Sequence, residues 1–524
     1  MPPWGWFGTF FLDSSRVYIG YRPTLMMSFL ANVYFFGDSI ISLRAVNIFL
    51  HTFNSLLVVC LIHLIQKSKK QSDFVSWVTG FLFLLHPIQT LGINFLWKRS
   101  SLLEATFLLI ALILHLQKRE TGYRPAKIFT QCLLLLLCVT TKESGVILPF
   151  LLGALDLSSS QRPDYFKQRS IIFLYSSLLL IVLGFIWFRT SYMPLYTSGS
   201  FSSDRRVLSP WNYFMNAFSV IPQYVGFWLF PRPLLMSDPL ASPSFPWSGF
   251  VTTGFLILLS ILLVIRLHWR LHRSPLMIFS IVVFWLGLTP VTSPFPLLFF
   301  LDQIRLYVPM IGLSCLIAIS LDRAKTLIRF KAMVPLTLAV LIISYGVSSF
   351  FQSLRYKSPI LIWKDVITEY PESGLAWEHL GVALDEMGEF TEAIEAFETA
   401  ARVEPQNPEF MINALRSSVK ANIPREKIQE KLNVILEKDL PIQQLSNVAL
   451  LEIDLQEYEK AQKHLLEIIR ILPHWDSAHL ALAVLWEKIG NFELAQQAYL
   501  HTLTLAPSSQ QAKDGLKRLG PAKK

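Results

Sequence analysis

Ionisable side chains that could carry chemistry lie at the ends of long apolar stretches in this chain. Such groups are costly inside hydrocarbon, so those beside membrane-crossing segments are candidate functional residues. Several cations gathered at the span ends on one side of the membrane would suit a phosphate group, because Arg and Lys donate hydrogen bonds to its oxygens. A carboxylate beside them would serve as a general base or hold a metal ion. The candidates are Asp13, Arg22, His86, Lys98, Arg99, Glu104, Lys142, Glu143, Asp302, Arg305 and Tyr307.

Several of these residues also have a structural explanation. Lys98 and Arg99 fit a snorkelling pair at the membrane surface, and His86 before Pro87 fits a kink at a helix end. Arg305 is a better functional candidate, because an Arg at the mouth of a span needs a partner. The sequence has no glycine-rich phosphate loop, His-Glu-x-x-His, Cys-x-x-Cys or nucleophile elbow, so no soluble-enzyme class is indicated.

The composition indicates a membrane protein rather than a nucleic-acid-binding one. Charged residues make up 16% of the 524 residues, whereas about 25% is usual for a soluble domain. The net charge of +10 is unevenly divided, since residues 356–524 carry 18 Lys and Arg against 25 Asp and Glu. In the first 355 residues, basic side chains gather in short clusters between apolar runs. That pattern is typical of membrane topology, and it disfavours a nucleic-acid partner.

Apolar runs of suitable length predict about ten membrane spans. Placing every basic loop in the cytoplasm requires Met215–Phe230 to be an interfacial or re-entrant helix. The candidate residues and the C-terminal third then share the opposite side. This topology puts the N-terminus outside. Either one more N-terminal span belongs to the protein, which we favour, or residues 24–36 have a role in the topology that hydropathy does not assign. The predicted spans are residues 44–65, 74–90, 100–116, 128–143, 145–157, 171–188, 249–268, 275–290, 306–321 and 333–353, with a tight turn at Lys142-Glu143.

The C-terminal third repeats at a pitch of 34 residues. Pro405, Pro473 and Pro507 are spaced by 68 and 34 residues. Seven residues of one unit match the tetratricopeptide pattern of paired antiparallel helices, and residues 408–441 form a degenerate unit broken by Pro424. Such a solenoid predicts a concave surface for a protein partner. The matching residues are Trp377, Gly381, Gly388, Ala393, Phe397, Ala400 and Pro405.

Short motifs along the chain resemble the transmembrane and TPR-containing O-mannosyltransferases and their bacterial relatives. Tyr21-Arg22-Pro23, with Asn47 and His51, resembles their opening. Leu85-His86-Pro87-Ile88 resembles their His-Pro motif, and Thr141-Lys142-Glu143 their Ser-Lys-Glu turn. Further similar stretches are Leu306-Tyr307-Val308-Pro309, Ile311-Gly312-Leu313, and Trp363, Pro371 and Trp377 at the link into the repeats.

The resemblance implies an all-α fold: a polytopic helix bundle like that of C-type membrane glycosyltransferases, followed by a tetratricopeptide-repeat α-solenoid. It implies four parts: a membrane domain at 1–355, a linker or half repeat at 356–373, repeats at 374–509 and a basic tail at 510–524. The expected location is the bacterial inner membrane or the ER membrane, with the repeats on the periplasmic or lumenal side.

The resemblance also implies an activity. A mannose-like hexose would move from a polyprenyl-phosphate donor to a protein or other extracytoplasmic acceptor, and the repeats would bind that acceptor or a partner. Asp13 is the candidate base. Supporting roles fall to His86, Glu143 and Tyr307, and Glu143 would orient a cation or help to hold a divalent metal ion. The residues expected to bind the donor phosphate are Arg22, Lys98, Arg99, Lys142 and Arg305.

The sequence departs from the family pattern at several positions. Where the family has an acidic pair in the first outer loop, this chain has Asp13 alone. Gln89 and Leu91 stand where His and Glu are usual, and Ile304 stands where Arg is expected, with Arg305 next to it. These departures keep a second hypothesis open, a non-catalytic membrane-anchored repeat scaffold. A transporter or lipid flippase is disfavoured, because the spans show no internal symmetry.

Overall fold

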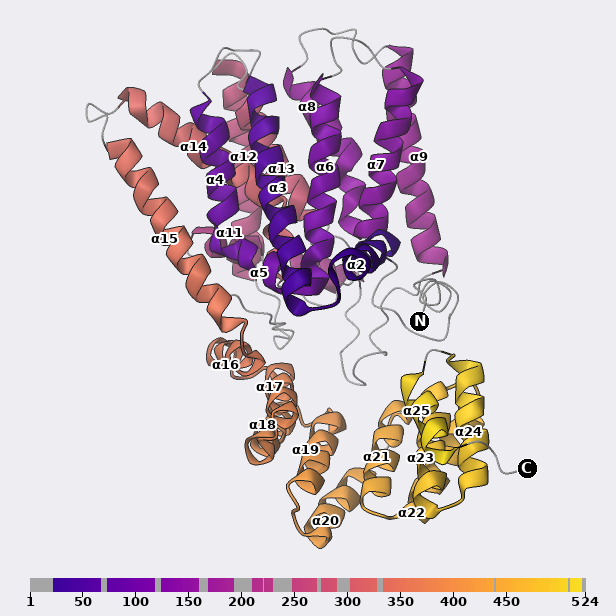
Figure 1. The fold of residues 1–524 in the computed structure, drawn as a ribbon. Coiled ribbons are helices and arrows are strands. Elements are labelled where there is room, and N and C mark those ends of the chain that lie inside the picture. Colours follow the sequence, from indigo (N-terminus) through magenta and orange to yellow (C-terminus); the bar gives the residue numbers. More distant parts are fainter. Residues whose placement is uncertain are drawn as a thin grey trace. The chain divides into compact units, whose positions relative to one another are not determined.

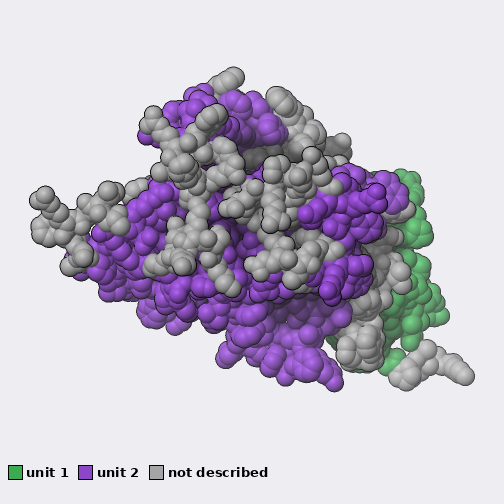
Figure 2. All heavy atoms as spheres, turned by 90° about the horizontal axis from the view of Figure 1, so that it is seen from above, with its two compact units in different colours: residues 1–19, 198–206, 359–524 green, residues 20–197, 207–358 purple. Residues whose placement is uncertain are grey.

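The computed structural model describes residues 22–66, 73–117, 124–159, 168–192, 210–219, 221–229, 247–270, 275–289, 302–327, 333–437, 440–507 and 509–520. Asp13 lies outside these residues. Every regular element in the described residues is a helix. The chain divides into two compact units, with the described residues up to 358 in one and those from 359 onward in the other (Figure 2).

The first unit is a bundle of apolar helices (Figure 1). Its centre is formed by α3 (Ile40–Gln66), α4 (Phe74–Leu85), α6 (Arg99–Gln117), α13 (Pro275–Leu288) and α14 (Pro309–Leu327). Side chains such as Val58, Leu61, Leu82 and Leu109 are at most 1% exposed there. Around them lie α7 (Pro125–Thr141), α8 (Leu148–Ser159), α9 (Arg169–Tyr192), α10 (Pro210–Ser219), α11 (Ile221–Leu229), α12 (Trp247–Arg270) and α15 (Met333–Arg355).

Each of the ten predicted spans coincides with a helix, but a count of ten spans is not confirmed. Among the described residues, five helices are long and apolar enough to cross a membrane, or six if a bent pair is one span. That pair is α4 with residues 87–94, bent by 52° after His86. In the most apolar stretches of the outer helices α12 and α15, only 6% of the residues are buried inside the protein. Apolar faces exposed in this way fit helices that are covered by lipid.

Short helical segments connect the long ones. They are η2 (Pro87–Gln89), α5 (Thr90–Asn94), η3 (Leu96–Lys98), η5 (Glu143–Ile147) and η7 (Gln303–Leu306). The turn expected at Lys142-Glu143 is present, since α7 ends at Thr141 and η5 begins at Glu143. The candidate residues are carried mainly by these connections, where the backbone leaves the regular helices.

Helix α2 (Pro23–Phe36) precedes the first long helix and was not predicted as a span. It lies across the end of the bundle at which α5 also lies (Figure 1). Tyr34, Phe35 and Phe36 at its C-terminal end are 67–73% exposed. Exposed aromatic side chains on a short helix of this kind are typical of segments that lie in the membrane interface.

The second unit is a series of antiparallel helix pairs that follows α16 (Pro359–Glu369). In the pair α17 (Gly374–Glu386) and α18 (Phe390–Val403), Gly381 lies under Phe397; a Cβ there would meet the ring at 2.7 Å. This close approach explains why the repeat pattern requires a small residue opposite a large one. The remaining pairs are α19 (Pro408–Lys420) with α20 (Arg425–Leu436), α21 (Ile442–Asp454) with α22 (Tyr458–Ile471), and α23 (Asp476–Ile489) with α24 (Phe492–Leu505).

The structure adds two details to the predicted repeats. Residues 408–441 contain a helix pair, because Pro424 lies between α19 and α20, where its missing N–H is harmless. Residues 510–519 of the expected tail form the helix α25, which packs against α24. Arg518 of α25 donates to both carboxylate oxygens of Glu487, at 2.9 and 3.0 Å. Helix α25 therefore packs as a further helix on the pair formed by α23 and α24.

Candidate functional site

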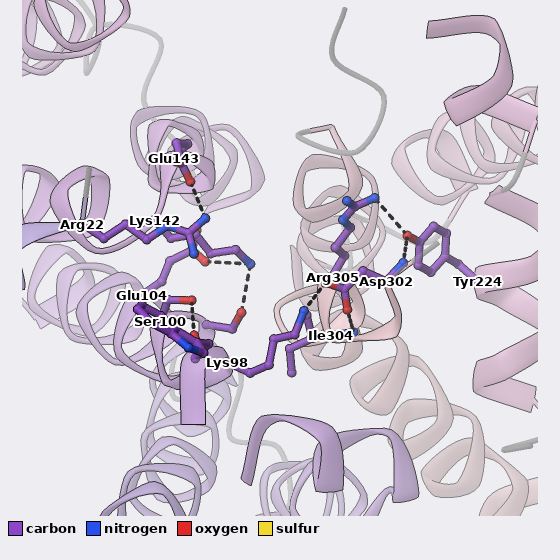
Figure 3. A network of polar contacts seen from close by, with 12 residues as sticks. Arg22, Lys98, Ser100, Glu104, Lys142, Glu143, Tyr224, Asp302, Ile304 and Arg305 are labelled. Atoms are coloured by element: carbon purple, nitrogen blue, oxygen red, sulfur yellow. Dashed lines mark hydrogen bonds and ion pairs between the residues drawn. The ribbon is translucent and has the colours of Figure 1, made fainter. Parts of the chain in front are cut away.

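A cluster of charged side chains from distant parts of the sequence meets at one end of the bundle (Figure 3). We call Arg22, Lys98, Lys142 and Arg305 the cation cluster. Each is partly buried or lies beside a buried group, and each comes from a helix start or a short connection rather than from the middle of a span. Lys142 interacts electrostatically with Arg22, Lys98 and Asp302, so these side chains form one local group.

Glu143 joins two arginines at the edge of this cluster. Its Oε2 accepts from Nη2 of Arg22 at 2.9 Å, and its Oε1 lies 3.5 Å from Nη2 of Arg189 at the end of α9. Burial alone would raise the pKa of Glu143, but Arg22 and Arg189 hold it below its ordinary value. Both carboxylate oxygens are thus occupied by cations, which fits the expected orienting role better than metal binding.

Lys142 directly follows α7, and its side chain reaches α6. Its Nζ donates to Oγ of Ser101 at 2.9 Å and lies 3.6 Å from Oε2 of Glu104, which is 2% exposed. Burial lowers the pKa of Lys142, and Glu104 opposes that shift. A serine and a carboxylate one helical turn apart on α6 therefore hold this ammonium group at the mouth of the bundle.

Asp302, just before η7, pairs with Lys98 at the end of η3. Burial alone would raise the pKa of Asp302, but Lys98 and then Arg305 hold it below its ordinary value. Asp302 also caps η7, where its Oδ1 accepts from the amide of Ile304 at 3.3 Å. The pair joins two connections that are 204 residues apart in the sequence.

Arg305 lies on the same side of the cluster as Asp302. Its Nη1 donates to the hydroxyl of Tyr224 in α11 at 3.5 Å, and the amide of Asp302 donates to the same oxygen at 3.1 Å. Tyr224 is fully buried. The segment predicted to be interfacial or re-entrant therefore contributes a side chain to the candidate site.

Arg99 differs from the other predicted phosphate ligands. Its side chain is 0% exposed and donates to Oδ1 of Asn47 at 2.7 Å and to Oδ1 of Asn32 at 2.9 Å. It also donates to the carbonyls of Ser28 and Leu43 and lies 4.3 Å from the ring centre of Phe29. These neutral acceptors satisfy the guanidinium group inside the protein. The geometry favours a structural role for Arg99, joining α2, α3 and α6.

His86 and Tyr307, expected to support catalysis, lie in the core. The amide of Ile88 donates to Nδ1 of His86, so Nε2 donates to the carbonyl of Trp228 at 3.1 Å. Tyr307 accepts from Nδ2 of Asn54 at 3.1 Å and donates to Nδ1 of His51 at 2.8 Å. Asn47 and His51, on which the resemblance partly rests, thus fasten helices together.

The structure does not bring together every predicted feature. The candidate base Asp13 lies outside the described residues, and its role stays a prediction. Within the described ranges, no group of three His, Cys, Asp or Glu side chains is placed to hold a metal ion. Arg189 and Tyr224 contribute to the site but were not predicted. Arg189 was hidden at the end of an apolar span, and Tyr224 gave no signal in hydropathy or spacing.

The cluster is suited to bind an anion. Among the described residues, five cations, Arg22, Lys98, Lys142, Arg189 and Arg305, accompany three carboxylates, Glu104, Glu143 and Asp302. In a partly buried site, such an excess of positive charge interacts with a phosphate more strongly than it would in water. The carboxylates keep the cations in place and limit their mutual repulsion.

The fold and the repeats define a multi-pass membrane protein with C-terminal tetratricopeptide repeats. The tetratricopeptide-repeat family model matches residues 374–407, the unit recognised from its spacing. Among curated proteins, the chain is similar to "Protein O-mannosyl-transferase TMTC3" of Homo sapiens, with 23% identity over 550 residues. This match covers 94% of this chain and 58% of the relative, so the chain spans less than two thirds of the human protein's length.

Other comparisons point the same way in sequence. A protein O-mannosyl-transferase of Caenorhabditis elegans is 23% identical over 75% of this chain and 55% of its own length. Among solved structures, the match to yeast Tom70 covers 89% of this chain and 88% of the Tom70 chain at 14% identity. Its TM-score is only 0.27. The resemblance to the transmembrane and TPR-containing O-mannosyltransferases is confirmed by the sequence relatives.

Proposed function

We propose that this protein is a membrane glycosyltransferase that moves a hexose from a polyprenyl-phosphate donor to a hydroxyl group of an extracytoplasmic acceptor. The observation that carries the proposal is the cation cluster at one end of an apolar bundle. A lipid-linked sugar phosphate needs this combination, because its chain lies in the membrane while its phosphate stays at the surface. The names of the sequence relatives support the sugar-transfer class.

In the proposed reaction, an oxygen of the acceptor attacks the anomeric carbon as the bond from that carbon to the phosphate oxygen breaks. The acceptor proton passes to a base, for which Asp13 is the candidate, and the polyprenyl phosphate leaves. Negative charge grows on the departing phosphate. Lys98, Lys142 and Arg305 would stabilise that charge as preorganised cations. No step is assigned to a metal ion.

The remaining features receive roles consistent with this reaction. Glu143 and Asp302 hold cations in position, and the repeats would bind the acceptor or a partner protein. The proposed location is the bacterial inner membrane or the ER membrane, with the cation cluster and the repeats on the periplasmic or lumenal side. That arrangement keeps all the basic loops in the cytoplasm.

Donor consumption by purified protein in liposomes tests the proposal. Dolichyl phosphate mannose would be supplied with an extract of secreted proteins, and the release of free dolichyl phosphate would be measured. Arg305→Ala should lower the rate about 100-fold, with normal expression and folding. Lys357→Ala, which removes an exposed charge outside the cluster, is the matched control. A folded wild-type protein that consumes no lipid-linked hexose would favour the scaffold hypothesis.

A further inference from the structure

Two buried amide side chains, one on η2 and one on η7, have no hydrogen-bond partner in the part of the chain that the structure describes. Gln89 ends η2 and Gln303 begins η7, and each is 1% exposed. In both residues the side-chain oxygen and the side-chain nitrogen are buried and unpartnered. Buried polar atoms almost always have partners, so two amides with all four polar atoms unpaired require an explanation.

The two amides lie in the same part of the bundle. Helices η2 and η7 pack against one another, and Ile304 beside Gln303 reaches the backbone at Gly92 in α5. Asp302, directly before Gln303, pairs with Lys98 of the cation cluster. Figure 3 shows Ile304 among the residues of this network. The unpaired amides therefore adjoin the place where a donor phosphate would bind.

The chemistry of the amides indicates what would satisfy them. Each side chain offers an acceptor oxygen and two N–H donors, a combination that complements neighbouring hydroxyl groups, which both donate and accept. A second phosphate would need cations instead, and an apolar chain would leave all four atoms unpaired. A polyhydroxylated ring matches them.

We infer that Gln89 and Gln303 bind the sugar hydroxyls of the lipid-linked donor, with the ring entering between η2 and η7. This inference rests on the proposed function. It assigns recognition of the phosphate to the cation cluster and recognition of the sugar to the two amides. Sites that use buried polar groups to bind hydroxyls discriminate strongly, because a ligand that lacks the hydroxyls leaves those groups unpaired.

The inference makes an unusual prediction about stability. Methionine has a volume close to that of glutamine and carries no polar group that must be satisfied. Gln89→Met and Gln303→Met should therefore each raise the melting temperature of the purified full chain in nanodiscs, by about 2 °C or more. Gln66→Met is the matched control. Gln66 is a buried glutamine whose Oε1 accepts from Ser76 at 2.9 Å, so its replacement should lower the melting temperature.

Lipid binding by the same proteins completes the test. The probes are dolichyl phosphate mannose, dolichyl phosphate glucose and sugar-free dolichyl phosphate. Wild-type protein should bind a sugar-bearing lipid more tightly than the sugar-free lipid. Both Met variants should bind the sugar-bearing lipid at least tenfold more weakly and the sugar-free lipid as the wild type does.

Each other outcome has a definite meaning. If both lipids bind equally well to wild type and variants, the amides do not recognise sugar and the inference is overturned, while the proposed function survives. If no polyprenyl phosphate binds to folded wild-type protein, the proposed function itself fails. Lowered melting temperatures in both variants, as in the Gln66 control, would show that ordered water alone satisfies the amides.

Discussion

Arg22 and Glu143 are 121 residues apart in the sequence, yet their side chains meet at 2.9 Å. Arg22 directly precedes α2, and Glu143 follows α7, so this ion pair attaches the first described helix to the end of α7. A second polar contact lies close by, where the hydroxyls of Thr24 and Thr140 are 2.7 Å apart. These contacts, together with the fully buried Leu25, hold helix α2 to the bundle.

Loss of the Glu143 carboxylate should loosen α2. Glu143→Gln removes the negative charge that binds both Arg22 and Arg189, although these groups are 22–31% exposed. We therefore expect a cost of only about 1 kcal/mol in the free energy of unfolding. The clearer signal is faster amide hydrogen exchange in residues 23–36, measured by mass spectrometry. Asp38→Asn, an exposed charge change next to the same helix, should leave exchange as in the wild type. If residues 23–36 exchange equally fast in Glu143→Gln and Asp38→Asn, the ion pair between Arg22 and Glu143 does not hold α2 in place.

Replacement of Arg99 by lysine should impair folding rather than substrate binding alone. Lysine keeps the positive charge but cannot reproduce the contacts to Asn47, Asn32 and the two carbonyls at once. Leaving these buried acceptors unpaired should cost about 2–4 kcal/mol. The measurement is the yield of folded protein in the membrane, together with its melting temperature. Arg266→Lys on the exposed face of α12 is the control. A stable Arg99→Lys protein with lost donor binding would restore the phosphate-binding role predicted from the sequence.

Acid should release helix α25 from α23 and α24. The pKa of Glu487 lies below its ordinary value of 4.5, mainly because its carboxylate accepts hydrogen bonds from Arg518. A carboxylate whose pKa is depressed in the folded state contributes stability above its unfolded value. That contribution is lost as the pH falls below about 4.5 and through the folded pKa. Hydrogen exchange in residues 510–519 should therefore rise in acid. In Glu487→Gln, hydrogen exchange in residues 510–519 should be fast already at pH 7. If exchange in that variant depends on pH as it does in the wild type, Glu487 is not the group that releases α25.

Cysteine accessibility can decide the side of the membrane on which the repeats lie. Glu389→Cys places a thiol at an exposed position between α17 and α18. In sealed cells it should react with a membrane-impermeant maleimide. Lys325→Cys, near a predicted cytoplasmic loop, should react only after permeabilisation. The reverse pattern would overturn both the topology and the assignment of the cation cluster to the periplasmic or lumenal side.

The helices and the repeats could be predicted because their signals are local. Apolar length gave the positions of the bundle helices, and the spacing of Gly381, Phe397 and Pro405 gave the repeat unit. The number of membrane spans was harder to predict, because helices such as α13 are apolar but too short to cross a membrane on their own. The position of Pro424 relative to the helices could not be predicted for a related reason: a proline between two helices and a proline within one look alike in sequence.

The candidate site could be predicted only in part. Lys98, Lys142 and Arg305 were recognised because charges at the ends of apolar runs are conspicuous. The carboxylates Glu104 and Asp302 were recognised too, but not which cation each would pair with, since a contact such as that between Lys98 and Asp302 depends on how distant segments pack. Arg99 has the same sequence signal as Lys98 one position earlier, yet it points into the core. The turn of about 100° between successive residues at a helix start separates two neighbouring cations into different environments.

The exposed aromatic end of α2 has a consequence for how the protein should be handled. The same helix that carries Tyr34, Phe35 and Phe36 is bound through Arg22 to Glu143 beside the cation cluster. If the headgroup layer supports that end of the helix, its removal by detergent withdraws support from the rim of the site. Phospholipid composition is then a structural variable of this protein, as much as temperature or salt, and lipid-free preparations would leave the rim of the site with less support.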